Sequence, residues 1–259
     1  MIRCTNRKIK TCSKTRLIDL HAFGFDSCGS HMATINPVSN PFCTRFVRPG
    51  QIPYRFVDPN ETPSAIVESL IACQAGLIVG PHGTGKSTLL HTLLPVLNAR
   101  FSEITHVQLC APQKNSWLSR QKQARKNSSE IFALLSGNHQ RCQSQAGNHL
   151  IIIDGIEQLS VIARRRLIRR VEDPTKRNPQ TILATSHRDL RGFQTLYRTS
   201  ATQQIVQQLT ESLLAGQSGQ LQSRIEQELA KRPIESSTNV RELWFDMYDL
   251  CVTEPDTFR

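Results

Sequence analysis

Residues 80–88 read Gly-Pro-His-Gly-Thr-Gly-Lys-Ser-Thr, which matches the pattern G-x-x-x-x-G-K-[ST] of a phosphate-binding loop. An apolar run at 76–79 precedes the loop, and a leucine-rich segment beginning at Leu89 follows it. These flanks predict a strand before the loop and a helix after it, which makes a chance match less frequent. The sequence therefore predicts an α/β fold, with helices on both sides of a parallel sheet, that binds ATP or GTP.

The residue types in this loop suit the binding of a phosphate. Its three glycines allow the backbone to curl so that successive N–H groups surround an anion, and the helix beginning near Lys86 adds the partial positive charge of its N-terminus. We expect Lys86 to reach the β- and γ-phosphates and the Ser87 hydroxyl to ligate Mg²⁺. The predicted nucleotide-binding residues are Gly80, Pro81, His82, Gly83, Thr84, Gly85, Lys86, Ser87 and Thr88.

A second motif, after the phosphate loop, lies at 150–154, which read Leu-Ile-Ile-Ile-Asp. An apolar run without alternation is typical of a central parallel strand, and such sheets bind ligands at the carboxyl ends of their strands. Asp154 is thus predicted to hold Mg²⁺ through water; an isolated aspartate at this place could instead cap a helix. Glu157 is the nearest acid able to orient or deprotonate an attacking water, although a glutamate in a first helical turn also complements the helix dipole.

Length and cysteine pattern limit the class of protein. The chain has 259 residues and no apolar stretch long enough to cross a bilayer, and its N-terminus has no apolar signal segment. Its eight cysteines contain no C-x-x-C pair and no zinc-ligand spacing. We therefore expect a cytoplasmic protein without membrane spans, disulfides or zinc.

The charge of the chain is +11, from 32 Lys and Arg against 21 Asp and Glu. Basic residues gather in 1–16, in 114–126, and on the segment after the Asp154 strand. The densest group is Arg164, Arg165, Arg166, Arg169 and Arg170. Basic clusters mark nucleic-acid binders, but they also form ordinary solvated faces, so both interpretations stay open.

Composition divides the chain into four parts. Residues 1–36 read as a disordered basic leader, as a start assigned upstream of Met32, or as an organelle transit peptide. Residues 37–62 are rich in proline and predict an extended lead-in whose aromatic rings pack on the core, where one ring could also floor an adenine pocket. Residues 63–199 are the predicted nucleotide-binding core. Residues 200–259 are a predicted helical lid.

Local patterns also predict the remaining elements. Thr62 and Pro63 open a helix at 64–73, and the helix after the phosphate loop is expected to kink or stop near Pro95. Strands are expected at 104–110, 181–187 and 193–198, and helices at 116–135, on the arginine cluster, from a Ser200 cap to 214, at 221–231 and at 239–251.

This order of elements resembles the AAA+ ATPases, most closely the group of bacterial replication initiators. The likeness rests on the phosphate loop, on Asp154-Gly155-Ile156-Glu157, and on Thr185-Ser186 at the end of the next strand. It implies that Ser186 is sensor 1 and that Arg241, within Asn239-Val240-Arg241-Glu242-Leu243, is sensor 2. It also implies that Arg188 or Arg191 is an arginine finger reaching a neighbouring subunit. ATP and Mg²⁺ are the implied cofactors, and copies of the chain or another protein are the implied partners.

Two features depart from that family. Gly155 stands where a second acid usually follows the aspartate, which favours a nucleotide switch or adaptor with little hydrolysis as an alternative. The loop is also similar to that of ABC-type ATPases, and His187 could imitate their histidine switch. The short segment between Lys86 and Asp154 and the incomplete signature at 135–139 speak against an ABC-type subunit. The sequence thus predicts an ATPase that couples hydrolysis to lid movement and assembly, with a switch, an ABC-type subunit and an ATP-dependent nucleic-acid binder as alternatives.

Overall fold

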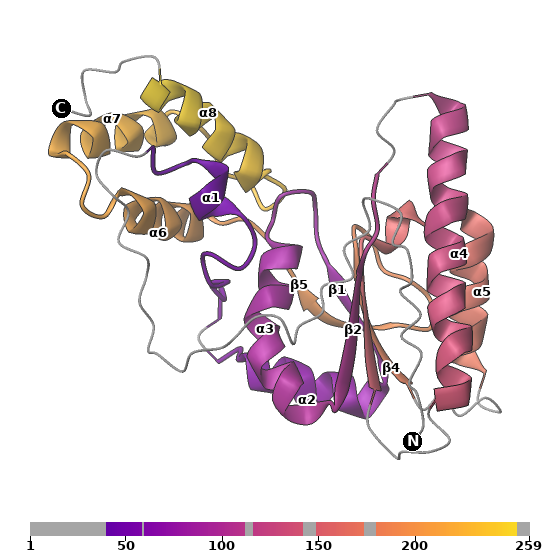
Figure 1. Cartoon of the computed structure of the whole chain (residues 1–259). Coiled ribbons are helices and arrows are strands. Elements are labelled where there is room, and N and C mark those ends of the chain that lie inside the picture. Colours follow the sequence, from indigo (N-terminus) through magenta and orange to yellow (C-terminus); the bar gives the residue numbers. More distant parts are fainter. Residues whose placement is uncertain (1–39, 59, 112–115, 142–148, 174–179, 253–259) are drawn as a thin grey trace, which may run out of the picture.

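The computed structural model describes residues 40–58, 60–111, 116–141, 149–173 and 180–252. The expectations for the 1–36 leader lie outside this range. The described chain forms an α/β core and a smaller helical unit beside it (Figure 1). Within the described residues, no helix combines the length and the apolar character needed to cross a membrane.

The core is built on a parallel sheet of five strands in the order β2-β3-β4-β1-β5. The strands are β1 (Ala75–Val79), β2 (Glu103–Gln108), β3 (His149–Asp154), β4 (Gln180–Ser186) and β5 (Gln194–Arg198). Every residue of β1, β3 and β4 is buried, whereas the edge strands β2 and β5 are partly exposed. Continuous apolar runs therefore mark the central strands, as expected for a sheet that is covered on both faces.

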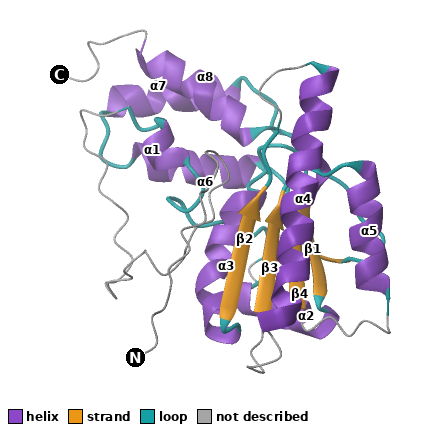
Figure 2. Ribbon diagram, turned by 45° about the vertical axis from the view of Figure 1, so that its right-hand side comes forward, coloured by secondary structure: helices purple, strands orange, loops and turns teal. Residues whose placement is uncertain are grey.

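Helices cover both faces of the sheet. In Figure 1 the sheet is seen on edge, with α2 (Pro63–Cys73) and α3 (Lys86–Arg100) on one side and α4 (Trp117–Arg141) and α5 (Val161–Glu172) on the other. Figure 2 shows α4 crossing in front of the strands. Alternate strand residues supply the two cores: Leu77 packs toward α4 and α5, and Ile78 toward α2 and α3. This arrangement confirms the predicted α/β fold.

The C-terminal unit consists of α6 (Gln203–Leu214), α7 (Gly219–Ala230) and α8 (Val240–Val252). These helices enclose a hydrophobic core of their own, which includes Ile225 and Met247. We call this unit the lid. In each of these helices the apolar residues recur at helical spacing and lie on one side. The helices therefore bury their apolar sides when they pack against one another.

The lead-in before α2 connects the lid with the core. It contains a single helical turn, α1 (Thr44–Val47), which the prediction of an extended segment missed. Phe42 is fully buried in the lid, and the Asn40 side chain donates a hydrogen bond to the Tyr248 carbonyl at 3.0 Å. Further along, Tyr54 and Phe56 pack edge-on against Tyr197 of β5. The aromatic rings thus pack as predicted, but on both units.

Three predicted boundaries differ from the structure. Of the two expectations for α3, a kink or a stop near Pro95, the stop was wrong: the helix continues to Arg100, because Pro95 removes one N–H donor while the leucines of α3 stay packed on the sheet. Helix α4 runs to Arg141, beyond the expected end at 135. The cap of α6 is Thr202, whose hydroxyl accepts from the Ile205 N–H at 3.2 Å, and not Ser200.

Candidate nucleotide-binding site

The phosphate loop joins the end of β1 to the start of α3, as predicted. The Thr84 hydroxyl lies 2.7 Å from the Thr199 hydroxyl, which fixes the loop to the segment after β5. Gly83 has φ +73°, and a Cβ placed there would lie 1.6 Å from the Asn239 side-chain oxygen of the lid. Only glycine fits this position, since the lid approaches the loop backbone so closely.

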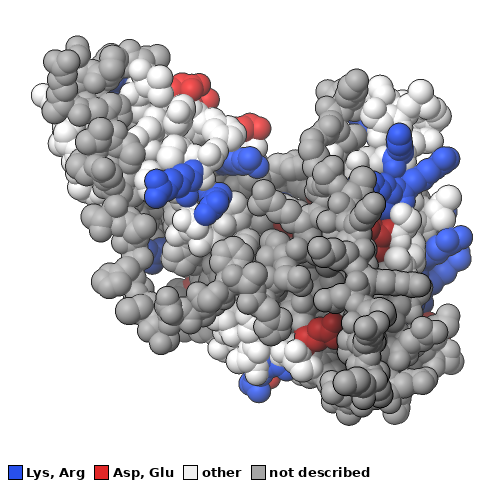
Figure 3. Space-filling view, viewed as in Figure 1, with Lys and Arg blue, Asp and Glu red and all other residues white. Residues whose placement is uncertain are grey.

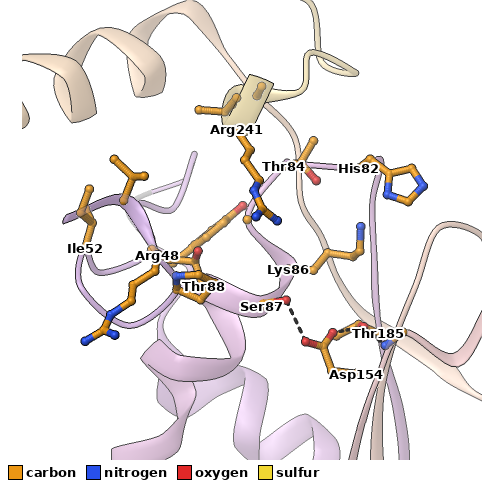
Figure 4. Close-up of a pocket in the computed structure, with 18 of the residues that line it drawn as sticks. Arg48, Ile52, His82, Thr84, Lys86, Ser87, Thr88, Asp154, Thr185 and Arg241 are labelled. Carbon is orange, nitrogen blue, oxygen red and sulfur yellow. Dashed lines mark hydrogen bonds between the residues drawn. The ribbon is translucent and has the colours of Figure 1, made fainter. Parts of the chain in front are cut away.

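Lys86 is the first residue of α3 and lies in the pocket below Arg241 (Figure 4). Its ammonium group donates to the carbonyls of Gly80 and Pro81, both at 2.6 Å. Burial lowers the pKa of Lys86, and the charges of Glu157 and Asp154 oppose this shift. The amine is therefore held inside the loop, beside two carboxylates, where a bound phosphate would meet it.

Asp154 ends β3 and is buried. Its Oδ2 accepts from the Ser87 hydroxyl at 2.8 Å, and its Oδ1 accepts from the Thr185 hydroxyl at 2.6 Å (Figure 4). A hydroxyl and a carboxylate in contact are hard oxygen donors, and Mg²⁺ usually takes one or two such protein ligands and completes its shell with water and phosphate oxygens. Ser87 and Asp154 therefore fit the predicted magnesium site.

Glu157 lies in η2 (Ile156–Gln158), a turn of 3-10 helix that follows Asp154. Its Oε1 is 2.6 Å from Nε2 of His187, the first residue after β4. Burial lowers the pKa of His187; the Glu157 charge opposes this shift, whereas Lys86 and His82 add to it. The His82 ring of the phosphate loop lies against the His187 ring, with centroids 3.7 Å apart.

These groups line one pocket of about 540 Å³, a size that suits a small ligand. The phosphate loop and the strand ends form its polar side. The lead-in and the lid form a more apolar side, which includes Val47, Ile52, Leu209 and Trp244. The pocket therefore lies between the core and the lid, with the lead-in as a third wall.

Most predicted site residues meet in this pocket. Residues 82–88 line it directly, and the carbonyls of Gly80 and Pro81 hold Lys86. Arg241 enters from α8, with its guanidinium 5.5 Å from the Phe245 ring centre, and points toward the loop (Figure 4). The structure thus brings the lid arginine and the phosphate loop together.

Three predicted residues lie elsewhere. Ser186 is buried and does not line the pocket; its hydroxyl accepts from the Arg188 N–H at 3.2 Å, and its neighbours Thr185 and His187 face the site instead. Arg188 and Arg191 do not line the pocket either. Arg191 is largely exposed, and its Nε lies 3.0 Å from a Glu172 carboxylate oxygen.

Sequence reasoning missed other residues of the site. Thr185 bridges Asp154 and the Gly155 N–H, and the only signal for it was a hydroxyl near the end of a strand. Of the lead-in aromatics offered as an adenine floor, Tyr54 is the one that lines the pocket. Arg48 and Arg55 also line it, and no motif in the sequence marks them.

Comparison with known protein families matches one part of the chain. Residues 71–194 match the AAA domain family. No curated protein matches the chain.

Solved structures also resemble the chain. The Orc1 protein of Aeropyrum pernix, solved in complex with DNA, is 14% identical with a TM-score of 0.51. The match covers 77% of this chain and 62% of the Orc1 chain, so this chain spans less than two thirds of the length of Orc1. Domain III of the Thermotoga maritima replication initiation protein DnaA is 12% identical (TM-score 0.44) over 76% of this chain and 86% of its own. C. elegans PCH-2 is 16% identical (TM-score 0.43), and the match covers 74% of this chain and 68% of the PCH-2 chain. At these identities the structural likeness concerns the fold alone. The matched AAA domain, the assembled phosphate loop and the fold shared with Orc1 agree with the AAA+ resemblance: the chain has the fold of a P-loop NTPase, and its residues 71–194 match the AAA domain family.

Proposed function

We propose that this protein is a magnesium-dependent ATPase that couples the state of the nucleotide to movement of the lid and to assembly with copies of itself or with a partner protein. One observation carries the proposal. The hydrogen-bonded pair Ser87 and Asp154 lies beside Lys86 in a pocket that Arg241 of the lid enters. The phosphate loop, two oxygen groups that suit Mg²⁺ and the lid arginine thus line one pocket, which supports a site for the transfer of a phosphoryl group.

The two sides of the pocket suggest how ATP would lie. Its phosphates would occupy the loop near Lys86, with Mg²⁺ held by Ser87 and Asp154, where the ion would neutralise charge on the phosphate oxygens. The base would extend toward the apolar wall formed by the lead-in and the lid. Arg241 would then contact the γ-phosphate from the lid.

Coupling to the lid is supported by the contacts that the phosphate loop already makes. Asn239 lies against Gly83, and Arg241 follows it by two residues at the start of α8. A change in the loop on nucleotide binding would therefore act directly on the first turn of α8. We also propose a cytoplasmic location, which the scattered cysteines of the sequence support.

Glu157→Gln tests whether this site hydrolyses ATP. We expect the variant to bind Mg·ATP as wild type does and to turn it over about 10²–10⁴ times more slowly, because the amide cannot accept the proton of the attacking water. Steady-state release of phosphate and titration with a fluorescent ATP analogue measure the two quantities. Glu226→Gln, on lid helix α7 away from the pocket, is the matched control.

Two outcomes would speak against this assignment. If Glu157→Gln turns over ATP at the wild-type rate, Glu157 only complements the helical turn and the base lies elsewhere. If the wild-type protein binds Mg·ATP without measurable turnover, it is a nucleotide-dependent switch, the alternative that Gly155 raised.

A second candidate function is ATP-dependent binding of nucleic acid. Helices α4 and α5 lie side by side, since the Arg170 guanidinium of α5 donates to the Leu135 carbonyl of α4 at 3.1 Å. Figure 3 shows Lys and Arg gathered on this side of the molecule. Exposed basic residues there are Arg120, Lys122, Arg125 and Lys126 on α4 and Arg165, Arg166 and Arg169 on α5. Such a face would attract a phosphate backbone.

Simultaneous replacement of Arg165, Arg166 and Arg169 by Ala tests this candidate. We expect duplex DNA to bind wild type with an affinity that falls steeply with salt, and the triple variant to lose at least about tenfold at low salt, because each lost phosphate contact removes one released counterion. Fluorescence anisotropy at several salt concentrations, and ATPase activity with and without DNA, measure these effects. Equal binding by both proteins would identify the arginines as a solvated face.

A further inference from the structure

Glu157 and His187 form a close pair in the candidate nucleotide pocket. We propose that His187 is a positioning residue, which holds Glu157 so that its second oxygen can accept a proton from the water that attacks the γ-phosphate. This inference rests on the proposed ATPase function and adds to it a residue that acts through Glu157.

The two carboxylate oxygens of Glu157 are in different environments. Oε1 lies 2.6 Å from Nε2 of His187, which is the distance of a strong, charge-assisted hydrogen bond. Oε2 is buried and accepts no hydrogen bond from the described part of the chain. A buried carboxylate oxygen without a partner costs free energy, so a water or substrate group is expected there. The pair thus fixes one oxygen and leaves the other without a hydrogen-bond partner, in a residue that lines the nucleotide pocket.

The backbone turns sharply between Asp154 and Glu157. Gly155 has φ +87°, a left-handed conformation that turns the chain sharply after Asp154 into the 3-10 turn carrying Glu157. The Thr185 hydroxyl accepts from the Gly155 N–H at 2.8 Å and donates to Asp154. The ends of β3 and β4 are therefore tied together two residues before Glu157 and His187 meet.

The surroundings of His187 suit a hydrogen-bond donor. Lys86 and His82 face the same cluster and disfavour a further cation, and burial lowers the pKa of His187 as well. A neutral imidazole with its proton on Nε2 can donate to Glu157 without neutralising the carboxylate. His82 packs against the His187 ring from the phosphate loop, which connects this pair to the segment that binds the nucleotide.

The test compares His187→Ala with His187→Gln, whose amide nitrogen keeps a donor at a similar reach. We expect His187→Ala to lower kcat by about 10- to 100-fold, part of the 10²–10⁴ that a general base contributes, with KM for Mg·ATP and the affinity for a fluorescent ATP analogue unchanged. His187→Gln should recover most of the lost kcat. Thermal unfolding of both variants checks that the fold is retained. If His187→Ala does not fold, His187→Gln alone is compared with wild type, and its kcat should stay near the wild-type value.

A double-mutant cycle with Glu157→Gln shows whether His187 acts through the carboxylate. If it does, His187→Ala should change kcat less than about twofold once Glu157 has become Gln, because the two effects are not additive. Slow turnover by Glu157→Gln together with wild-type turnover by His187→Ala would overturn the positioning role and leave the ATPase proposal intact. Fully additive effects, or a Gln variant as slow as the Ala variant, would also overturn it. Absence of turnover in wild type would overturn the ATPase proposal itself.

Discussion

Lys86→Ala is expected to abolish nucleotide binding or turnover while leaving the fold intact. The lysine ammonium is held inside the phosphate loop by two carbonyls, beside Asp154 and Glu157, so it is placed to neutralise phosphate charge. Loss of one preorganised donor typically lowers turnover by about 10²–10³-fold, and loss of this charge should weaken binding as well. The change removes a loop cation and no core volume, so the melting temperature should hardly move.

Titration with a fluorescent ATP analogue and a thermal melt measure both parts of this prediction. Lys231→Ala is the matched control, since Lys231 is an exposed lid lysine paired with Glu228 outside the pocket. Unchanged affinity of Lys86→Ala for the analogue would show that the phosphates bind elsewhere. A large loss of stability would show that the lysine mainly holds the loop together.

Local patterns predicted the parts of this fold that depend on neighbouring residues. The apolar run 150–154 is a fully buried central strand ending in Asp154, and Thr62 caps α2 by accepting from the Ala65 N–H. Both follow from short-range rules, since burial on two faces requires continuous apolar residues and a helix start requires a side-chain acceptor. Ends of elements were less predictable: Pro95 stays inside α3 because tertiary packing outweighs one lost hydrogen bond.

Contacts between distant segments decided the rest of the site. Which of Thr185, Ser186 and His187 faces the pocket depends on the alternation of side chains along β4, and a shift of one residue moves a side chain to the opposite face. The sequence indicated this strand end, where Thr185 and His187 line the pocket and Ser186, the residue chosen from the sequence, does not. Likewise, the lid contact between Asn239 and Gly83 joins residues far apart in the chain, and no local pattern encodes it.

Activity that rises with protein concentration is the largest effect we expect. Arg188 and Arg191 follow β4 outside the pocket of their own chain, so either could complete only a neighbour's site. An arginine supplied in trans is worth about 10³–10⁵ in kcat in other NTPases. Specific activity should therefore increase as the protein assembles, and replacing the finger by Ala should remove that increase while Mg·ATP binding persists.

The two arginines make different demands on such an assembly. Arg191 already pairs with Glu172 of its own chain, but its side chain is 86% exposed, and an exposed ion pair contributes little free energy, so release toward a neighbour costs little. ATPase rate against concentration for Arg188→Ala, Arg191→Ala and the control Arg100→Ala, with light scattering to follow size, separates the two. Arg100 is an exposed arginine at the far end of α3, so its loss makes the same change in charge away from the pocket. Rates strictly proportional to enzyme concentration in every variant would mean that each chain hydrolyses ATP alone. The positive charge that an arginine finger supplies would then have to come from Arg241 of the lid within the same chain.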